Sequence, residues 1–235
     1  RYRYVTGVQT CALPIYGDAL VLSHNKLVFI LGNLKKAFPK LARVSSYANG
    51  CNITRKTDDE LAGLAAHKLT LIYMGLESGS QEILDRCGKS STVEEMITAV
   101  RRAESAGIKS SVIVLLGLGG KARSGEHVRA TIEALNRMQP RYLSFLSLMV
   151  IPDTPLEEEI RRGDFEELSA LELLKESYAI IQGLELTKTI FRSNHASNYL
   201  ALEGSFPKDK EKMLEMLKSA IDGGVVLRPE FLRGL

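Results

Sequence analysis

Carboxylate, hydroxyl and glycine residues stand at the ends of the apolar runs of this sequence. Asp18 follows a glycine, Glu77 ends the run LTLIYMGLE with Ser78 directly after it, and Gly117 directly follows the run SVIVLL. Parallel β/α folds bind ligands at the carboxyl ends of their strands, so strands of this kind would bring these residues to one edge. A carboxylate holds an ammonium group well, and a glycine lets the backbone approach a ligand closely. The sequence therefore predicts a small-molecule site built from strand ends.

The cysteines and the common nucleotide motifs narrow the chemistry. Cys11, Cys51 and Cys87 lie far apart in the sequence, which is neither a disulfide framework nor a metal-binding spacing. Reduced thiols are the default for such cysteines. The dinucleotide pattern GxGxxG does not open a helix after the first strand, and the P-loop pattern GxxxxGK[ST] is absent. Both nucleotide readings are therefore weak.

Strand-like and helix-like segments alternate along the chain, and these elements must position the polar residues. Expected strands cover residues 42–48, 69–77, 111–120 and 142–151. Expected helices cover residues 25–38, 58–66, 81–87, 93–106, 124–138, 156–162, 168–184 and 208–223. Thr57 and Thr92 stand where helix N-caps are expected. This alternation predicts βαβ units and a parallel sheet, either an open doubly wound sheet or a partial β/α barrel.

Composition excludes several classes of protein. The chain has 235 residues, of which 45% are hydrophobic and 25% are charged, and a net charge of +3. This balance is typical of a globular domain and gives no signal for nucleic acid binding. Apolar runs stay below the roughly 18 residues that a membrane span needs. We therefore expect a cytoplasmic protein without a membrane partner.

The first residues of the chain resemble translated sequencing adapter. Val5–Ile15 reads VTGVQTCALPI, which agrees codon by codon with a common short-read adapter. We therefore expect residues 1–16 to be an artefact, native sequence to begin near Gly17, and the parent protein to extend further upstream.

Four motifs in order make residues 17–202 resemble the radical S-adenosylmethionine (SAM) superfamily. These motifs are GLESGS with ILDRCGK, VIVLLGLGG, LSLMVIPDTPLEEEI, and the acidic turn at Gly17 and Asp18. The resemblance is greatest to the branches related to oxygen-independent coproporphyrinogen oxidase and to tRNA-modifying enzymes. It implies an open, partial parallel β/α barrel over residues 17–190 that lacks its first strand and cluster loop. Residues 191–235 would then form a C-terminal extension.

The resemblance also implies a SAM site. Asp18 would hold the SAM amino group, Glu77 and Ser78 would contact its ribose or carboxylate, and Lys89 would contact its carboxylate. Gly117 would let the backbone approach the cofactor. The implied SAM-binding set is Gly17, Asp18, Glu77, Ser78, Lys89, Gly117, Met149 and Val150. Each has a structural alternative, such as a turn or N-cap for Asp18, a helix-end lysine for Lys89, and plain core for Met149 and Val150.

The family's chemistry requires cysteines that this sequence does not show. Three cysteines in a CxxxCxxC loop hold a [4Fe-4S] cluster whose open iron binds SAM. The resemblance implies that the parent reductively cleaves SAM to a 5′-deoxyadenosyl radical, which acts on an unknown substrate. A flavodoxin or ferredoxin would supply the electron. Cys51 and Cys87 have no partners at this spacing, so we expect the fragment itself to be inactive and unable to bind the cluster.

A polar segment, RSNHASNYL, follows the last expected barrel helix. Arg192, Asn194, His195, Asn198 and Tyr199 make it a candidate substrate-facing edge, and the alternative, which we favour slightly, is a polar loop that closes the barrel bottom or the open edge.

His24, His67 and His127 are scattered in the sequence, and we interpret them as surface residues. One rival function is a metal-independent β/α-barrel lyase or isomerase that uses Glu77 or Lys89 as acid and base. The other is a non-catalytic binding domain.

Overall fold

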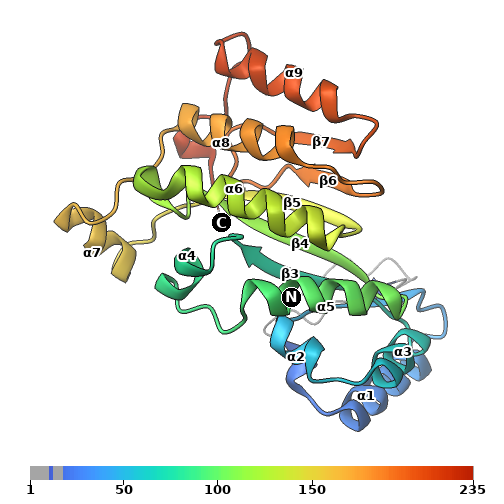
Figure 1. Ribbon diagram of the computed structural model, residues 1–235. Helices are drawn as coiled ribbons and strands as arrows, with labels where there is room; N and C mark the ends of the chain where they lie inside the picture. The colour runs from blue at the N-terminus through green and yellow to red at the C-terminus, as the bar shows by residue number, and fades with distance from the viewer. Residues whose placement is uncertain (1–10, 13–17, 235) are drawn as a thin grey trace. The chain divides into compact units, whose positions relative to one another are not determined.

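The computed structural model describes residues 11–12 and 18–234, and it shows an α/β protein in which helices alternate with strands (Figure 1). The chain divides into two compact units. The first unit is Arg1–Gly75 with Ser90–Ser111, and the second is Leu76–Lys89 with Val112–Leu235. Of the segment expected to be adapter, residues 1–10 and 13–16 lie outside the described residues, as does Gly17.

The first unit consists of parallel strands and the helices that connect them. In chain order it holds β1 (Cys11–Ala12), the 3₁₀ turn η1 (Ala19–Val21), α1 (His24–Ala37), β2 (Arg43–Tyr47), α2 (Gly50–Thr54), α3 (Asp58–Ala66), most of β3 (Leu69–Glu77) and α5 (Val93–Ser105). β2 pairs in parallel with β1 on one side, where Cys11 lies opposite Arg43, and with β3 on the other. Ile53, Leu61 and Ile72 are fully buried and form part of its core.

The second unit begins with the end of β3 and carries the later elements. In chain order it holds α4 (Gln81–Arg86), most of β4 (Lys109–Leu116), α6 (Gly120–Met138), β5 (Tyr142–Ser147), α7 (Pro155–Arg162), α8 (Ala170–Gly183), β6 (Ile190–Ser193), β7 (Leu202–Ser205), α9 (Lys210–Ile221) and the 3₁₀ turn η2 (Glu230–Leu232). β5 and β6 pair in parallel, whereas β7 runs antiparallel to β6. Phe191 of β6 packs edge-on against Phe145 of β5, with ring centroids 4.9 Å apart.

Local sequence explains where several helices begin. Thr57, Thr92 and Ser169 each form a capping box with the glutamate three residues later, so two unpaired donors at each helix start are satisfied. The predicted strand at residues 69–77 has the observed bounds of β3. The predicted fold class, an open and mainly parallel α/β arrangement, is confirmed.

Two predicted strands are shorter than their apolar runs. β4 ends at Leu116 because Gly117 turns the backbone out of the strand with φ +83°, and α6 begins at Gly120 instead of Ser124. β5 ends at Ser147, so residues 148–151 are apolar without being strand. The predicted C-terminal extension, residues 191–235, includes most of the β6–β7 hairpin, whose first strand starts at Ile190. Within the described residues, no helix has both the length and the apolar character of a membrane-crossing segment.

Candidate functional site

Asp18 organises the end of the first unit's sheet. It forms an isolated parallel bridge with Tyr47, next to the end of β2. Its Oδ1 accepts the amide of Leu20 at 2.8 Å, and its Oδ2 accepts the amide of Asn49 and the side-chain amide of Asn52, both at 2.7 Å. The carboxylate thus fastens the turn after Asp18 to the segment that begins α2. A carboxylate has about four acceptor sites, so a SAM amino group would have to compete with or join these donors.

Glu77 and Lys89 form an ion pair in the second unit. The Lys89 Nζ lies 3.2 Å from the Glu77 Oε1, and the two side chains are 28% and 25% exposed. Glu77 ends β3 in the left-handed region at φ +62°, and Gly88 turns the chain at φ +65° after α4. These two turns bring together residues that the sequence analysis named separately.

Ser78, in contrast, faces the interior. Its side chain is fully buried, its Oγ accepts the amide of Ser80 at 3.1 Å, and the Oγ lies 2.8 Å from the Nδ1 of His127. The interpretation of His127 as a surface residue is wrong, because it is fully buried in α6. Burial lowers the pKa of His127 to about 4, although Glu126 opposes this shift. The helical spacing of His127 with buried Thr131 was the signal that indicated an interior face.

Gly117 is held by a glutamate that the sequence analysis did not name. The Gly117 amide donates to the Oε1 of Glu176 at 2.6 Å, and the hydroxyl of Ser124 donates to the Oε2. Burial raises the pKa of the Glu176 carboxyl, while the hydrogen bonds from Ser124 and Gly117 lower it. An added Cβ at Gly117 would meet the Leu173 Cδ2 at 3.0 Å. Glu176 lies on the buried face of α8 with Leu173. A carboxylate on an otherwise apolar helix face is a sequence feature that could have indicated a buried polar contact.

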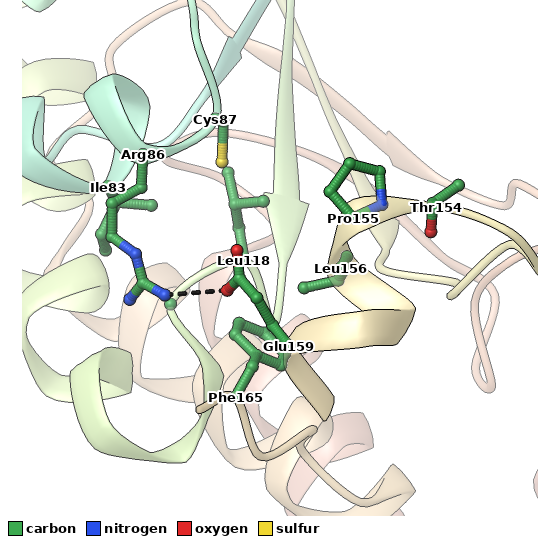
Figure 2. A pocket seen from close by; sticks show the side chains of 10 residues that line it. Ile83, Arg86, Cys87, Leu118, Thr154, Pro155, Leu156, Glu159 and Phe165 are labelled. Atoms are coloured by element: carbon green, nitrogen blue, oxygen red, sulfur yellow. Dashed lines mark hydrogen bonds and ion pairs between the residues drawn. The ribbon is translucent and has the colours of Figure 1, made fainter. Parts of the chain in front are cut away.

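A cleft of about 330 Å³ follows these strand ends in the second unit (Figure 2). Its lining combines α4 and its C-cap, the turn before α6, α7 and its N-cap, and one residue of the segment between α7 and α8: Ile83, Arg86, Cys87, Leu118, Gly119, Thr154, Pro155, Leu156, Glu159 and Phe165. The Arg86 Nη2 pairs with the Glu159 Oε2 at 3.0 Å across the cleft. Burial raises the pKa of the Cys87 thiol. The cleft can therefore take a mainly apolar group beside one ion pair.

The predicted substrate edge divides into buried and exposed residues. Asn198 is buried, where its Nδ2 donates to the Phe145 carbonyl at 2.7 Å and its Oδ1 accepts the Ser147 hydroxyl at 2.9 Å. These bonds support the loop-closing interpretation for Asn198. Arg192 and Asn194 are exposed.

The rest of the predicted set has local partners or partial exposure. The His195 Nδ1 lies 2.9 Å from the Ser197 Oγ, and Arg233 stacks on the Tyr199 ring at 4.1 Å. Met149 and Val150 are half-buried just beyond β5. SAM contacts by either residue stay a prediction.

The charges and the possible metal ligands of the described residues indicate which cofactors they could hold. Among residues 11–12 and 18–234, no group of three or more His, Cys, Asp and Glu residues could hold a metal ion. The described residues therefore do not fit an iron–sulfur cluster. The Glu77–Lys89 pair does fit the amino-acid end of SAM, which carries one ammonium and one carboxylate.

The open α/β sheet with polar residues at its strand ends is of the β/α type, in which ligands bind at the carboxyl ends of the strands. The sequence profile of the Radical SAM superfamily matches residues 15–135, just over half of the 235 residues, and the chain belongs to this superfamily. Its members are enzymes that use SAM and a [4Fe-4S] cluster.

Three similar proteins place the chain within longer relatives. An uncharacterized methyltransferase of Pyrococcus horikoshii is 32% identical over 87 residues, which are 37% of this chain and 18% of that protein. The structure of Methanocaldococcus infernus Elp3 aligns with a TM-score of 0.61 and 15% identity over 92% of this chain and 55% of that chain. Coproporphyrinogen III oxidase of Escherichia coli, a radical SAM enzyme, aligns with a TM-score of 0.57 and 15% identity over 74% and 40%. The two structural likenesses show the fold, and the chain spans less than two thirds of each relative.

Proposed function

We propose that this chain is the SAM-binding part of a radical SAM enzyme, and that Glu77 and Lys89 hold the amino-acid end of SAM. The observation that carries the proposal is their partly exposed ion pair at the end of β3. The carboxylate offers acceptors to the SAM ammonium, and the lysine offers donors to the SAM carboxylate. The left-handed backbone of Glu77 supports the proposal, because strained residues cluster at ligand sites.

The cluster chemistry belongs to the whole protein in this proposal. A bound [4Fe-4S] cluster supplies the electron that cleaves SAM reductively, with flavodoxin or ferredoxin as the electron donor. Because the described residues offer no set of thiolate ligands, we propose that the chain as given binds SAM without cleaving it. The other predicted SAM contacts of the second unit, at Gly117, Met149 and Val150, are part of the same proposal, and a SAM contact by Asp18 stays a separate prediction for the first unit.

The relatives suggest a reaction class that we propose for the whole protein. Membership of the superfamily favours SAM chemistry over a metal-independent lyase or isomerase. The Pyrococcus relative is named a methyltransferase, so methyl transfer is the reaction we propose to test first in the whole protein. The apolar cleft with its Arg86–Glu159 pair is a candidate place for part of the substrate.

Calorimetric titration of the purified chain with SAM tests the proposal. We expect saturable one-to-one binding, and we expect Lys89→Met and Glu77→Gln each to raise Kd about tenfold, as the loss of about 1.4 kcal/mol does. Lys121→Met is the matched control, because Lys121 pairs with Glu166 on the surface of the same unit. If the wild-type chain does not bind SAM, or if Lys89→Met binds as tightly as the wild type, the proposal is wrong.

A further inference from the structure

A buried polar network joins the ends of β3 and β4 within the second unit. The side chains of His127 and Glu176 are both fully buried, and Ser78 beside them is buried as well. The His127 Nδ1 lies 2.8 Å from the Ser78 Oγ, and its Nε2 lies 3.7 Å from the Glu176 Oε1. The same Oε1 accepts the Gly117 amide. Burying polar side chains costs free energy that hydrogen bonds offset only in part. A buried polar network at two strand ends therefore indicates that it fixes the local backbone.

The neighbours of His127 assign its tautomer. The Ser80 amide donates to the Ser78 Oγ, which leaves the Ser78 hydroxyl proton free to be donated to the His127 Nδ1. The ring proton then resides on Nε2, the atom that faces Glu176. Within the described residues this Nε2 has no partner at hydrogen-bond distance. A neutral ring with an Nε2 proton is therefore the state that the surrounding groups favour.

The residue types match those of a hydrolase triad, but the burial does not. A nucleophilic serine must reach its substrate, and Ser78 has no exposed surface. The network also extends to a backbone amide, that of Gly117. Its role is therefore to position the strand ends.

We infer that Glu176 is a positioning residue that holds the Gly117 turn at the end of β4, and that the ring of His127 packs between its carboxylate and the Ser78 turn at the end of β3. Gly117 leaves the strand at φ +83°, and the Glu176 carboxylate accepts its amide. Ser78 directly follows Glu77, the proposed SAM ligand. The functional part of this inference rests on the proposed function, because SAM would bind on the Gly117 turn that Glu176 holds and on the neighbouring turn at the end of β3.

Amide hydrogen exchange and SAM titration test the inference on the same protein. Glu176→Met removes the acceptor at similar volume, whereas Glu176→Gln keeps a carbonyl oxygen for the Gly117 amide. We expect Glu176→Met to speed exchange at Gly117 by about 10- to 100-fold and to raise the Kd for SAM by about tenfold, with Glu176→Gln largely restoring both. Glu215→Gln on exposed α9 is the control and leaves both unchanged.

The two readouts separate the inference from the proposed function. Unchanged exchange at Gly117 in Glu176→Met overturns the inference, as does acceleration spread evenly over the whole of β4. If Glu176→Met does not fold, the wild type decides, because its Gly117 amide should exchange at least about 100-fold more slowly than a free peptide amide. A wild-type chain that shows this protection yet does not bind SAM refutes the proposed function and leaves the hydrogen bond intact.

Discussion

Replacing His127 with glutamine isolates one buried titration, and its size follows from the structure. The pKa of His127 is about 4 in the folded chain, compared with 6.5 for the free side chain, because the ring is fully buried. The difference of 2.5 units corresponds to about 3 kcal/mol of unfolding free energy. The unfolded chain binds the proton first as pH falls, so this stability is present above pH 6.5 and is lost as pH approaches 4.

Glu176 opposes this trend and must be separated from it. Its pKa is raised by burial, so its contribution to folding becomes more favourable as pH falls. Comparing the wild type with His127→Gln cancels most of this effect, because both proteins retain Glu176.

Urea unfolding at pH values from 7 to 4 provides the assay. We expect the stability advantage of the wild type over His127→Gln to shrink by about 3 kcal/mol across this range. His67→Gln, at a partly exposed site, serves as the control. Parallel stability curves for the wild type and His127→Gln would refute the argument that the imidazole of His127 is buried and neutral in the folded chain.

Two further predictions concern packing and the cluster. Gly79→Ala should lower stability by about 3 kcal/mol, because the new Cβ would stand 2.1 Å from the Ala130 carbonyl oxygen, whereas Gly32→Ala in α1 meets no atom within 4 Å and should be neutral or stabilising; equal melting temperatures would contradict this. Anaerobic reconstitution of the chain with iron and sulfide should give no stoichiometric [4Fe-4S] absorption, and incubation with SAM and a reductant should give no 5′-deoxyadenosine; substantial 5′-deoxyadenosine would show that the catalytic ligands are present after all.

Sequence reasoning succeeded where the signal was local. The capping boxes at Thr57 and Thr92 depend on residues three apart in the sequence. The continuous apolar run at residues 69–77 predicts the strand β3. It failed where the partner was distant. Residues 148–151 are apolar enough for a strand, but they lack the pairing that would extend β5. The sequence of a segment does not tell whether a neighbouring strand pairs with it.

The site shows the same division between local and distant signals. Glu77 and Lys89 were each named from their motifs, but their pairing depends on two left-handed turns. His127 and Glu176 were missed because residue type was given more weight than helical position. Both lie on faces that helical periodicity marks as interior.

The β6–β7 hairpin has a consequence for where this protein can vary. Parallel strands all deliver the chain to the same edge, but antiparallel β7 carries it back to the edge from which β5 and β6 start. The connection at residues 194–201 therefore lies at the sheet edge where β5 ends. The chain enters α9 from the opposite edge, where β7 ends. Arg228 and Arg233 tie the final residues back to this connection through the carbonyls of residues 195–198. Relatives that differ in substrate should thus diverge more at residues 194–201, and in the residues that Arg228 and Arg233 attach to them, than in the buried face of α9.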